Sequence, residues 1–140
     1  MPNWITNIVH IESDDYEEEE SSLSSLYKQL KTDESDFDFN AIVKQPWNLE
    51  KGNCSGQHKD GEVCWYGWNI QNWGTKWNSE AVSYLMDTYD DDKTVFEILV
   101  KFETAWSPPM PVLEKLSENF KVRFTWKDEG SDDWHNWQKI

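Results

Sequence analysis

The alternation of apolar and polar residues predicts four β-strands. The first covers residues 3–12, with Ile5, Asn7, Val9 and Ile11 on the face expected to be buried. Residues 79–88 and 94–104 predict a hairpin that turns at residues 90–93, and a short helix over 79–86 is the alternative for its first arm. The last strand covers residues 121–127. The residues expected on the buried faces of the last two strands are Phe96, Ile98, Val100, Phe102, Val122, Phe124 and Trp126.

Two segments change to the helical period and predict amphipathic helices. Leu23, Leu26, Tyr27 and Leu30 follow the i, i+3, i+4, i+7 spacing. The second helix is expected to begin at Ser107 as its N-cap, with Pro108 and Pro109 in the first turn, where a missing N–H costs nothing. Its apolar positions are Val112, Leu113, Leu116 and Phe120.

The segment between these elements, residues 37–78, has no clear period. It holds five of the ten tryptophans and five of the six glycines. We interpret residues 46–78 as a long inserted loop that its indoles hold against the rest of the chain. The predicted order is therefore β-α-β-β-α-β in a single domain over residues 1–140, which is an α+β, ferredoxin-like antiparallel sheet with a Trp/Gly-rich insertion.

The chain is strongly acidic: it has 27 acidic and 13 basic residues, which give a net charge of −14. So acidic a chain repels nucleic-acid phosphates and anionic membranes and favours basic protein surfaces. The chain has no apolar run that would span a membrane and no basic region followed by an apolar run at its N-terminus, so we expect a soluble, cytoplasmic protein. The densest acidic block is made of Asp14, Asp15, Glu17, Glu18, Glu19 and Glu20.

Both cysteines of the chain lie in the inserted loop, in the pattern Cys54-x3-His58-x5-Cys64. Thiolate and imidazole are preferred zinc ligands, so the pattern predicts a structural zinc site, with Asp60, His10 or His135 as candidate fourth ligands. The alternative is a pair of unrelated free thiols, since a disulfide is not expected to persist in the cytoplasm. The sequence contains no phosphate-binding loop, dinucleotide fingerprint, nucleophile elbow or HExxH motif, so we expect no catalytic activity.

Four phrases occur in one order along the chain: MPNW at the start, FDFNAIVKQPWNL, NWGTKW and TAWSPP. Together they resemble the YubB-like ferredoxin-like family of phage and plasmid proteins. The resemblance implies a ferredoxin-like fold and an origin in a mobile element, and it implies no reaction. For the motif residues we favour a packing role over a binding role, and we expect Trp73 and Trp106 to be buried.

The leading functional hypothesis is a phage-type anti-defence inhibitor, similar to an anti-CRISPR protein. It would bind a basic surface of a host nuclease without contacting nucleic acid itself. The residues expected to contact the partner are those of the acidic block together with Trp68, Trp73 and Trp77. One alternative is a module that binds single-stranded nucleic acid on an open sheet face, and another is a small metal-dependent enzyme.

Overall fold

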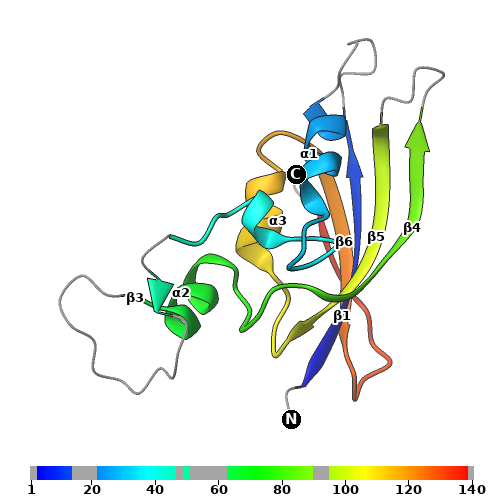
Figure 1. Ribbon diagram of the computed structural model, residues 1–140. Helices are drawn as coiled ribbons and strands as arrows, with labels where there is room; N and C mark the ends of the chain where they lie inside the picture. The colour runs from blue at the N-terminus through cyan, green and yellow to red at the C-terminus, as the bar shows by residue number, and fades with distance from the viewer. Residues whose placement is uncertain (1–2, 14–21, 47–48, 51–62, 90–94, 139–140) are drawn as a thin grey trace.

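Five antiparallel strands form one sheet in the order β4-β5-β1-β6-β7 (Figure 1). This computed structural model describes residues 3–13, 22–46, 49–50, 63–89 and 95–138. The central strand β1 (Trp4–Glu12) lies between β5 (Val95–Ala105) and β6 (Lys121–Asp128). The edges are β4 (Glu80–Tyr89), which pairs with β5, and β7 (His135–Gln138), which pairs with β6.

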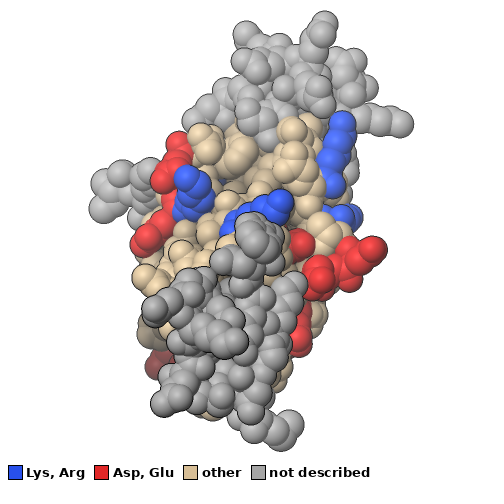
Figure 2. All heavy atoms as spheres, turned by 60° about the vertical axis from the view of Figure 1, so that its left-hand side comes forward, with Lys and Arg blue, Asp and Glu red and all other residues tan. Residues whose placement is uncertain are grey.

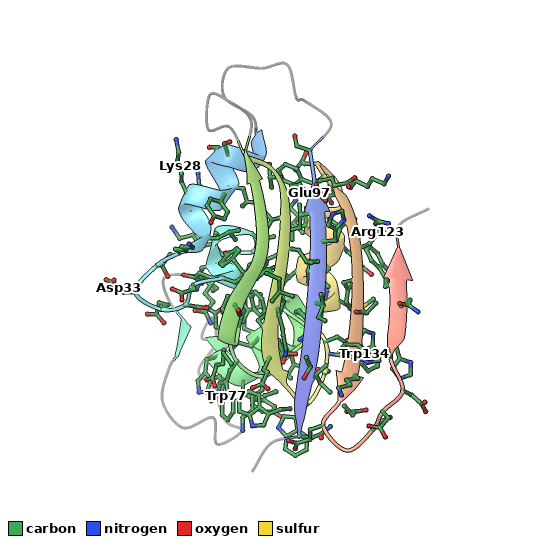
Figure 3. All side chains as sticks on the ribbon, turned by 90° about the vertical axis from the view of Figure 1, so that its right-hand side faces the viewer. Lys28, Asp33, Trp77, Glu97, Arg123 and Trp134 are labelled. Carbon is green, nitrogen blue, oxygen red and sulfur yellow. The ribbon has the colours of Figure 1, made fainter. Side chains whose placement is uncertain are left out.

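Two helices, α1 (Ser22–Leu30) and α3 (Met110–Leu116), cover one face of the sheet, and no helix of the described residues covers the other, open face (Figures 1 and 3). Each strand that the pattern predicted is present, and the arm that had a helix as its alternative is strand β4. The strand order and the two crossing helices confirm the ferredoxin-like plan. The predicted turn at residues 90–93 lies outside the described residues, as does the side chain of Phe96.

Smaller elements lie beyond the sheet, between α1 and β4. They are the 3₁₀ turn η1 (Phe39–Ala41), the parallel pair β2 (Leu49–Glu50) and β3 (Val63–Cys64), and helix α2 (Trp65–Asn72). The prediction that residues 37–78 are irregular is therefore wrong for α2. That helix ends where the Trp73 and Gly74 N–H groups both donate to the Asn69 carbonyl.

Aromatic rings link these smaller elements to the sheet. Phe37 stacks on Phe102 of β5 at a centroid distance of 4.9 Å, and Phe39 meets Trp73 edge to face at 5.5 Å. Trp73 is 2% exposed, and its indole N–H donates to the Val43 carbonyl at 2.8 Å. The predicted burial of Trp73 is confirmed. Its ring joins η1 and the end of α2 to the same core as the sheet.

The phrases NWGTKW and TAWSPP pack against each other. Gly74 has a φ of +80°, and a Cβ atom there would lie 2.5 Å from Cδ of Pro111, so only glycine fits. The Thr75 hydroxyl donates to the Ala105 carbonyl at 2.7 Å, and the Ser107 hydroxyl donates to the Gly74 carbonyl. These contacts give Gly74, Thr75 and Ser107 a structural role.

Three expectations about the second half of the chain need correction. Ser107 is not an N-cap, because α3 begins at Met110 after Pro109 and the Ser107 side chain is used by Gly74. Trp106 is 53% exposed: it follows the last residue of β5 with a φ of +74°, which turns its ring away from the core. The sheet has a fifth strand, β7, where the predicted order of four strands had none.

Replacing Trp73 with Ala should lower the free energy of unfolding by roughly 3–5 kcal/mol. The substitution leaves a cavity in the core and removes the indole N–H that the Val43 carbonyl accepts. The exposed Trp106 provides the matched control, and its change to Ala should cost less than about 1 kcal/mol. Urea unfolding followed by circular dichroism measures both. Equal losses for the two variants would contradict the assignment of Trp73 to the core.

Candidate functional site

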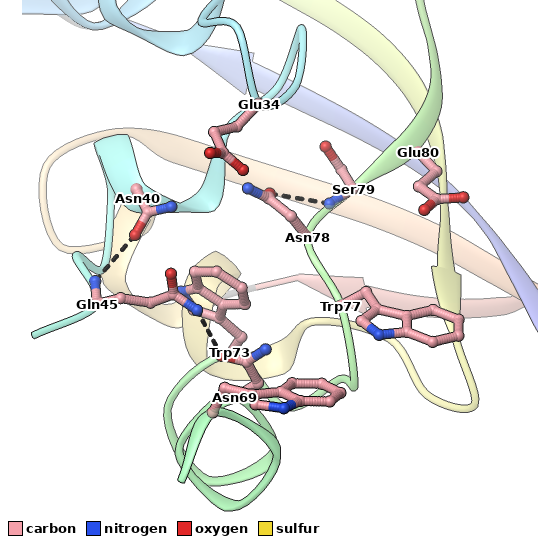
Figure 4. Close-up of a pocket in the computed structure, with 10 residues that line it drawn as sticks. Glu34, Asn40, Gln45, Asn69, Trp73, Trp77, Asn78, Ser79 and Glu80 are labelled. Carbon is pink, nitrogen blue, oxygen red and sulfur yellow. Dashed lines mark hydrogen bonds between the residues drawn. The ribbon is translucent and has the colours of Figure 1, made fainter. Parts of the chain in front are cut away.

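A pocket of about 490 Å³ opens beside η1, α2 and the segment that leads into β4 (Figure 4). This volume is within the range of small-ligand and side-chain sites. Its walls combine three indoles, four carboxamides, one hydroxyl and two carboxylates. The lining residues are Glu34, Asn40, Gln45, Trp65, Asn69, Trp73, Trp77, Asn78, Ser79 and Glu80.

The buried carboxylate of Asp38 holds two of these carboxamides in place. Asn78 Nδ2 donates to Asp38 Oδ1 at 2.7 Å, and Asn40 donates to the same oxygen through its backbone N–H at 2.9 Å and its side chain at 3.0 Å. Thr32 Oγ1 donates to Asp38 Oδ2 at 2.7 Å. One carboxylate thereby joins the segment after α1, the η1 turn and the segment before β4.

The same contacts fix the ionisation of Asp38. Burial alone would raise the pKa of this carboxyl, but the hydrogen bonds from Asn78, Thr32 and Asn40 favour the charged form. The net effect is a pKa below the ordinary value of 3.8. Asp38 is therefore ionised at neutral pH and accepts hydrogen bonds only.

A second chain of hydrogen bonds orders the opposite wall of the pocket. The backbone N–H of Gln45 donates to Asn40 Oδ1 at 2.9 Å, and Gln45 Nε2 donates to Asn69 Oδ1 at 2.8 Å. Asn69 Nδ2 in turn donates to the Lys76 carbonyl at 2.8 Å. Gln45 Oε1 accepts no hydrogen bond from the described residues and is available to a ligand.

The chemistry of the pocket fits a cationic side chain. Glu34 and Glu80 are exposed at one end of the pocket, whereas Gln45 and Asn69 lie at the other (Figure 4). Carboxylates attract an ammonium or guanidinium group, indole faces bind cations, and the Gln45 oxygen accepts an N–H. Lys76 Nζ lies 4.5 Å from the centroid of the Trp77 ring, so an ammonium group of the chain itself already makes a cation–π contact with this indole.

The predicted contact residues divide into three groups. Trp77 lines the pocket and is partly exposed, as a contact residue should be. Trp73 is buried beneath the pocket and packs edge to face on Trp68 at 5.5 Å, so its indole supports the wall and has almost no surface to offer a partner. The acidic block, Asp14, Asp15 and Glu17–Glu20, lies outside the described residues.

Of the predicted zinc ligands, Cys54 and His58 also lie outside the described residues. Cys64 is buried at the start of α2 and is disulfide-bonded, so the expectation of a free thiol is wrong at this position. A disulfide sulfur is not a thiolate and does not bind zinc. The zinc site therefore stays a prediction for the reduced protein.

The chain has the ferredoxin-like fold. Residues 72–134 match the family model described as the ferredoxin-like domain in Api92-like protein. The matched segment runs from the last residue of α2 to the approach to β7 and supplies Trp73, Trp77 and residues 78–80 to the pocket. The rest of the lining comes from the preceding part of the chain. No curated protein and no solved structure matches the chain.

The open face of the sheet bears on the nucleic-acid alternative. Recognition of single-stranded RNA on such a face uses aromatic side chains on the central strands. Here the described side chains of β1, β5 and β6 on that face, from Thr6 to Glu12 and at the positions opposite them, include one ring, the imidazole of His10. The others are charged, aliphatic or hydroxyl-bearing, and Trp4 lies at the beginning of β1. Within the described part of the chain, no helix is long and apolar enough to cross a membrane.

Replacing Asp38 with Asn should lower the free energy of unfolding at pH 7 by roughly 1.5–3 kcal/mol, because the amide presents a donor to groups that already donate. The native pKa is depressed, so the stabilisation is complete above the ordinary value of 3.8 and is lost as the pH falls through the native pKa. The difference between the two proteins should therefore shrink below about pH 4.

Urea titrations at pH 7 and at low pH measure this difference. The exposed Asp33, changed to Asn, is the control and should alter stability by less than about 0.5 kcal/mol at either pH. A cost for Asp38→Asn that stays constant down to low pH would contradict the role given to the carboxylate.

Proposed function

We propose that this protein is an anti-defence inhibitor that binds a basic surface of a host nuclease, such as a CRISPR effector, and keeps that surface from DNA. The observation that carries the proposal is the pocket, in which two rim carboxylates and indole walls suit a lysine or arginine side chain. Such side chains line the DNA channels of nucleases. In this proposal the pocket anchors one of them.

The net charge of −14 also favours binding to a basic protein surface. On the surface in Figure 2, acidic and basic side chains of the described residues occur in small separate groups. Much of the negative charge is in runs outside the described residues, above all the block at residues 14–20. We propose that these runs speed the encounter through long-range attraction, and that the pocket supplies the specific contact.

The origin and setting of the protein are part of the proposal. The phrases MPNW, NWGTKW and TAWSPP support a place among YubB-like proteins of phages and plasmids. A mobile element gains from blocking a host nuclease, and such an inhibitor acts in the host cytoplasm. The protein acts by occupying a surface and needs no catalytic residues.

Removing both rim charges, with Glu34→Gln and Glu80→Gln together, should weaken binding by about tenfold to a hundredfold, because a cation in the pocket loses its partners. The matched control is Glu114→Gln with Glu118→Gln. These two substitutions also remove two charges. The exposed carboxylates that they replace lie on α3 and just after it, away from the pocket lining. The control therefore reproduces the change in net charge without touching the pocket.

Affinity is measured by titration against an RNA-guided nuclease of the Cas9 type and a restriction endonuclease at two salt concentrations. The pocket variant should dissociate faster than the native protein, whereas the control should change mainly the association rate. If the two double variants bind the nuclease equally well, the pocket is not the contact. If native protein binds neither nuclease, these two target classes are excluded.

A further inference from the structure

A second group of chemically active side chains lies on the open face of the sheet, where β1 ends. His10 and Glu12 project from β1, and Glu97 projects from the neighbouring β5 (Figure 3 labels Glu97). His10 Nε2 lies 2.6 Å from Glu97 Oε1 and 3.5 Å from Glu12 Oε1. One nitrogen and two carboxylate oxygens from these residues all lie within 4.8 Å of one another.

The strand register explains why these side chains meet. Glu12 is directly opposite Glu97 in the antiparallel β1–β5 pair. Like charges in this position destabilise a sheet unless a cation lies between or beside them. The three side chains are also well shielded from water, with exposed fractions of 14% for His10, 24% for Glu12 and 26% for Glu97. Shielding strengthens the repulsion between the carboxylates and the attraction of both to a cation.

Two basic side chains compensate part of this charge. Lys121 Nζ and Arg123 Nη2 each lie 3.9 Å from a Glu12 carboxylate oxygen. Both are about half exposed, at 56% and 49%, so water screens them. Among the described residues, neither of them forms an ion pair with Glu97, which contacts the imidazole of His10.

The contact between Arg123 and His10 fixes the tautomer of the ring. Arg123 Nη2 lies 3.1 Å from His10 Nδ1, and a guanidinium only donates hydrogen bonds, so Nδ1 is the acceptor. Nε2 then carries a hydrogen and donates it to Glu97. The ring is thus held with Nε2 directed at both carboxylates.

We infer that His10, Glu12 and Glu97 form a binding site for a divalent transition-metal ion of the zinc type. One imidazole and two carboxylates are a common three-ligand set for such ions, and water completes the coordination. A hollow of about 460 Å³ beside the cluster, lined in part by His10, Thr125 and Asn136, gives water or a further ligand access to the ion. The site shares no residue with the pocket lined by Trp65, Trp73 and Trp77, called the tryptophan pocket below. It does not depend on the proposed function.

Metal binding at His10 requires the ring hydrogen to change position, and the contact with Arg123 therefore competes with the metal. When Nε2 binds the ion through its lone pair, the ring hydrogen must reside on Nδ1. Nδ1 then no longer accepts a hydrogen bond, so Arg123 must release it. The guanidinium also repels the ion. Arg123 therefore holds the cluster together without metal, and removing its charge should increase metal affinity.

The test is a titration of the full-length protein with Zn²⁺, followed by long-range ¹H–¹⁵N NMR spectra of the histidine rings. This readout separates His10 from His58 and His135, so zinc held by Cys54 or Cys64 is not mistaken for zinc on the sheet. We expect the Nε2 resonance of His10 to shift with saturating behaviour. In the same titration Nδ1 should acquire the signature of a protonated nitrogen.

Matched variants identify the ligands. Glu97→Gln should weaken the affinity measured at His10 by at least about tenfold. Glu103→Gln removes the same charge from the same face of β5 at a position opposite Thr6, and it should leave the affinity within about twofold of native. Arg123→Gln should strengthen the affinity. Amide spectra of each variant establish that it is folded.

Two results would overturn the site. One is a His10 ring whose nitrogen signals do not move up to about 1 mM Zn²⁺, the weak end of specific affinities. The other is an equal loss of affinity in Glu97→Gln and Glu103→Gln, which means that zinc follows only the general negative charge of the sheet.

Discussion

The carboxylate of Asp38 is the contact on which the arrangement of the smaller elements depends. It accepts hydrogen bonds from Thr32, Asn40 and Asn78, which belong to the segment after α1, the η1 turn and the segment before β4. Because these donors surround a buried charge, each loses a strong interaction if the carboxylate is absent. The tryptophan pocket is built on this contact, since Asn40 and Asn78 are part of its wall. Trp73 adds the apolar counterpart by filling the space beneath.

The sheet and its two covering helices could be predicted from the spacing of their apolar residues. These residues recur every second position in the strands and every three or four positions in the helices, as they do in elements with one buried face. Helix α2 could not: its sequence WYGWNIQN has aromatic residues on all sides and a glycine inside, so no apolar stripe marks it. Its place is set by contacts made far along the chain, such as that between Asn69 and Gln45. Strand β7 has four residues, too few for a period to be visible, and it exists because the edge of β6 is there to pair with it.

Trp77 was predicted as a contact residue, and the carboxamides around it were missed. Asn40, Gln45 and Asn69 are spread over thirty positions, and no motif connects them. The one sequence signal was Asp38, because an Asp just before a short turn often accepts from the N–H two positions later, as it does here from Asn40. Trp106 was expected in the core because tryptophans usually are buried, but its positive φ at the end of β5 turns it outward.

We propose that the acidic charge attracts a basic target from a distance and that the pocket makes the specific contact. Hydrogen–deuterium exchange of the protein, alone and bound to a target nuclease, tests this division most directly. Binding should slow exchange in residues 34–45 and 65–80, which surround the pocket, and should leave exchange on the open face of the sheet unchanged. Protection confined to the sheet face or to residues 14–20, with the pocket segments unaffected, would contradict it.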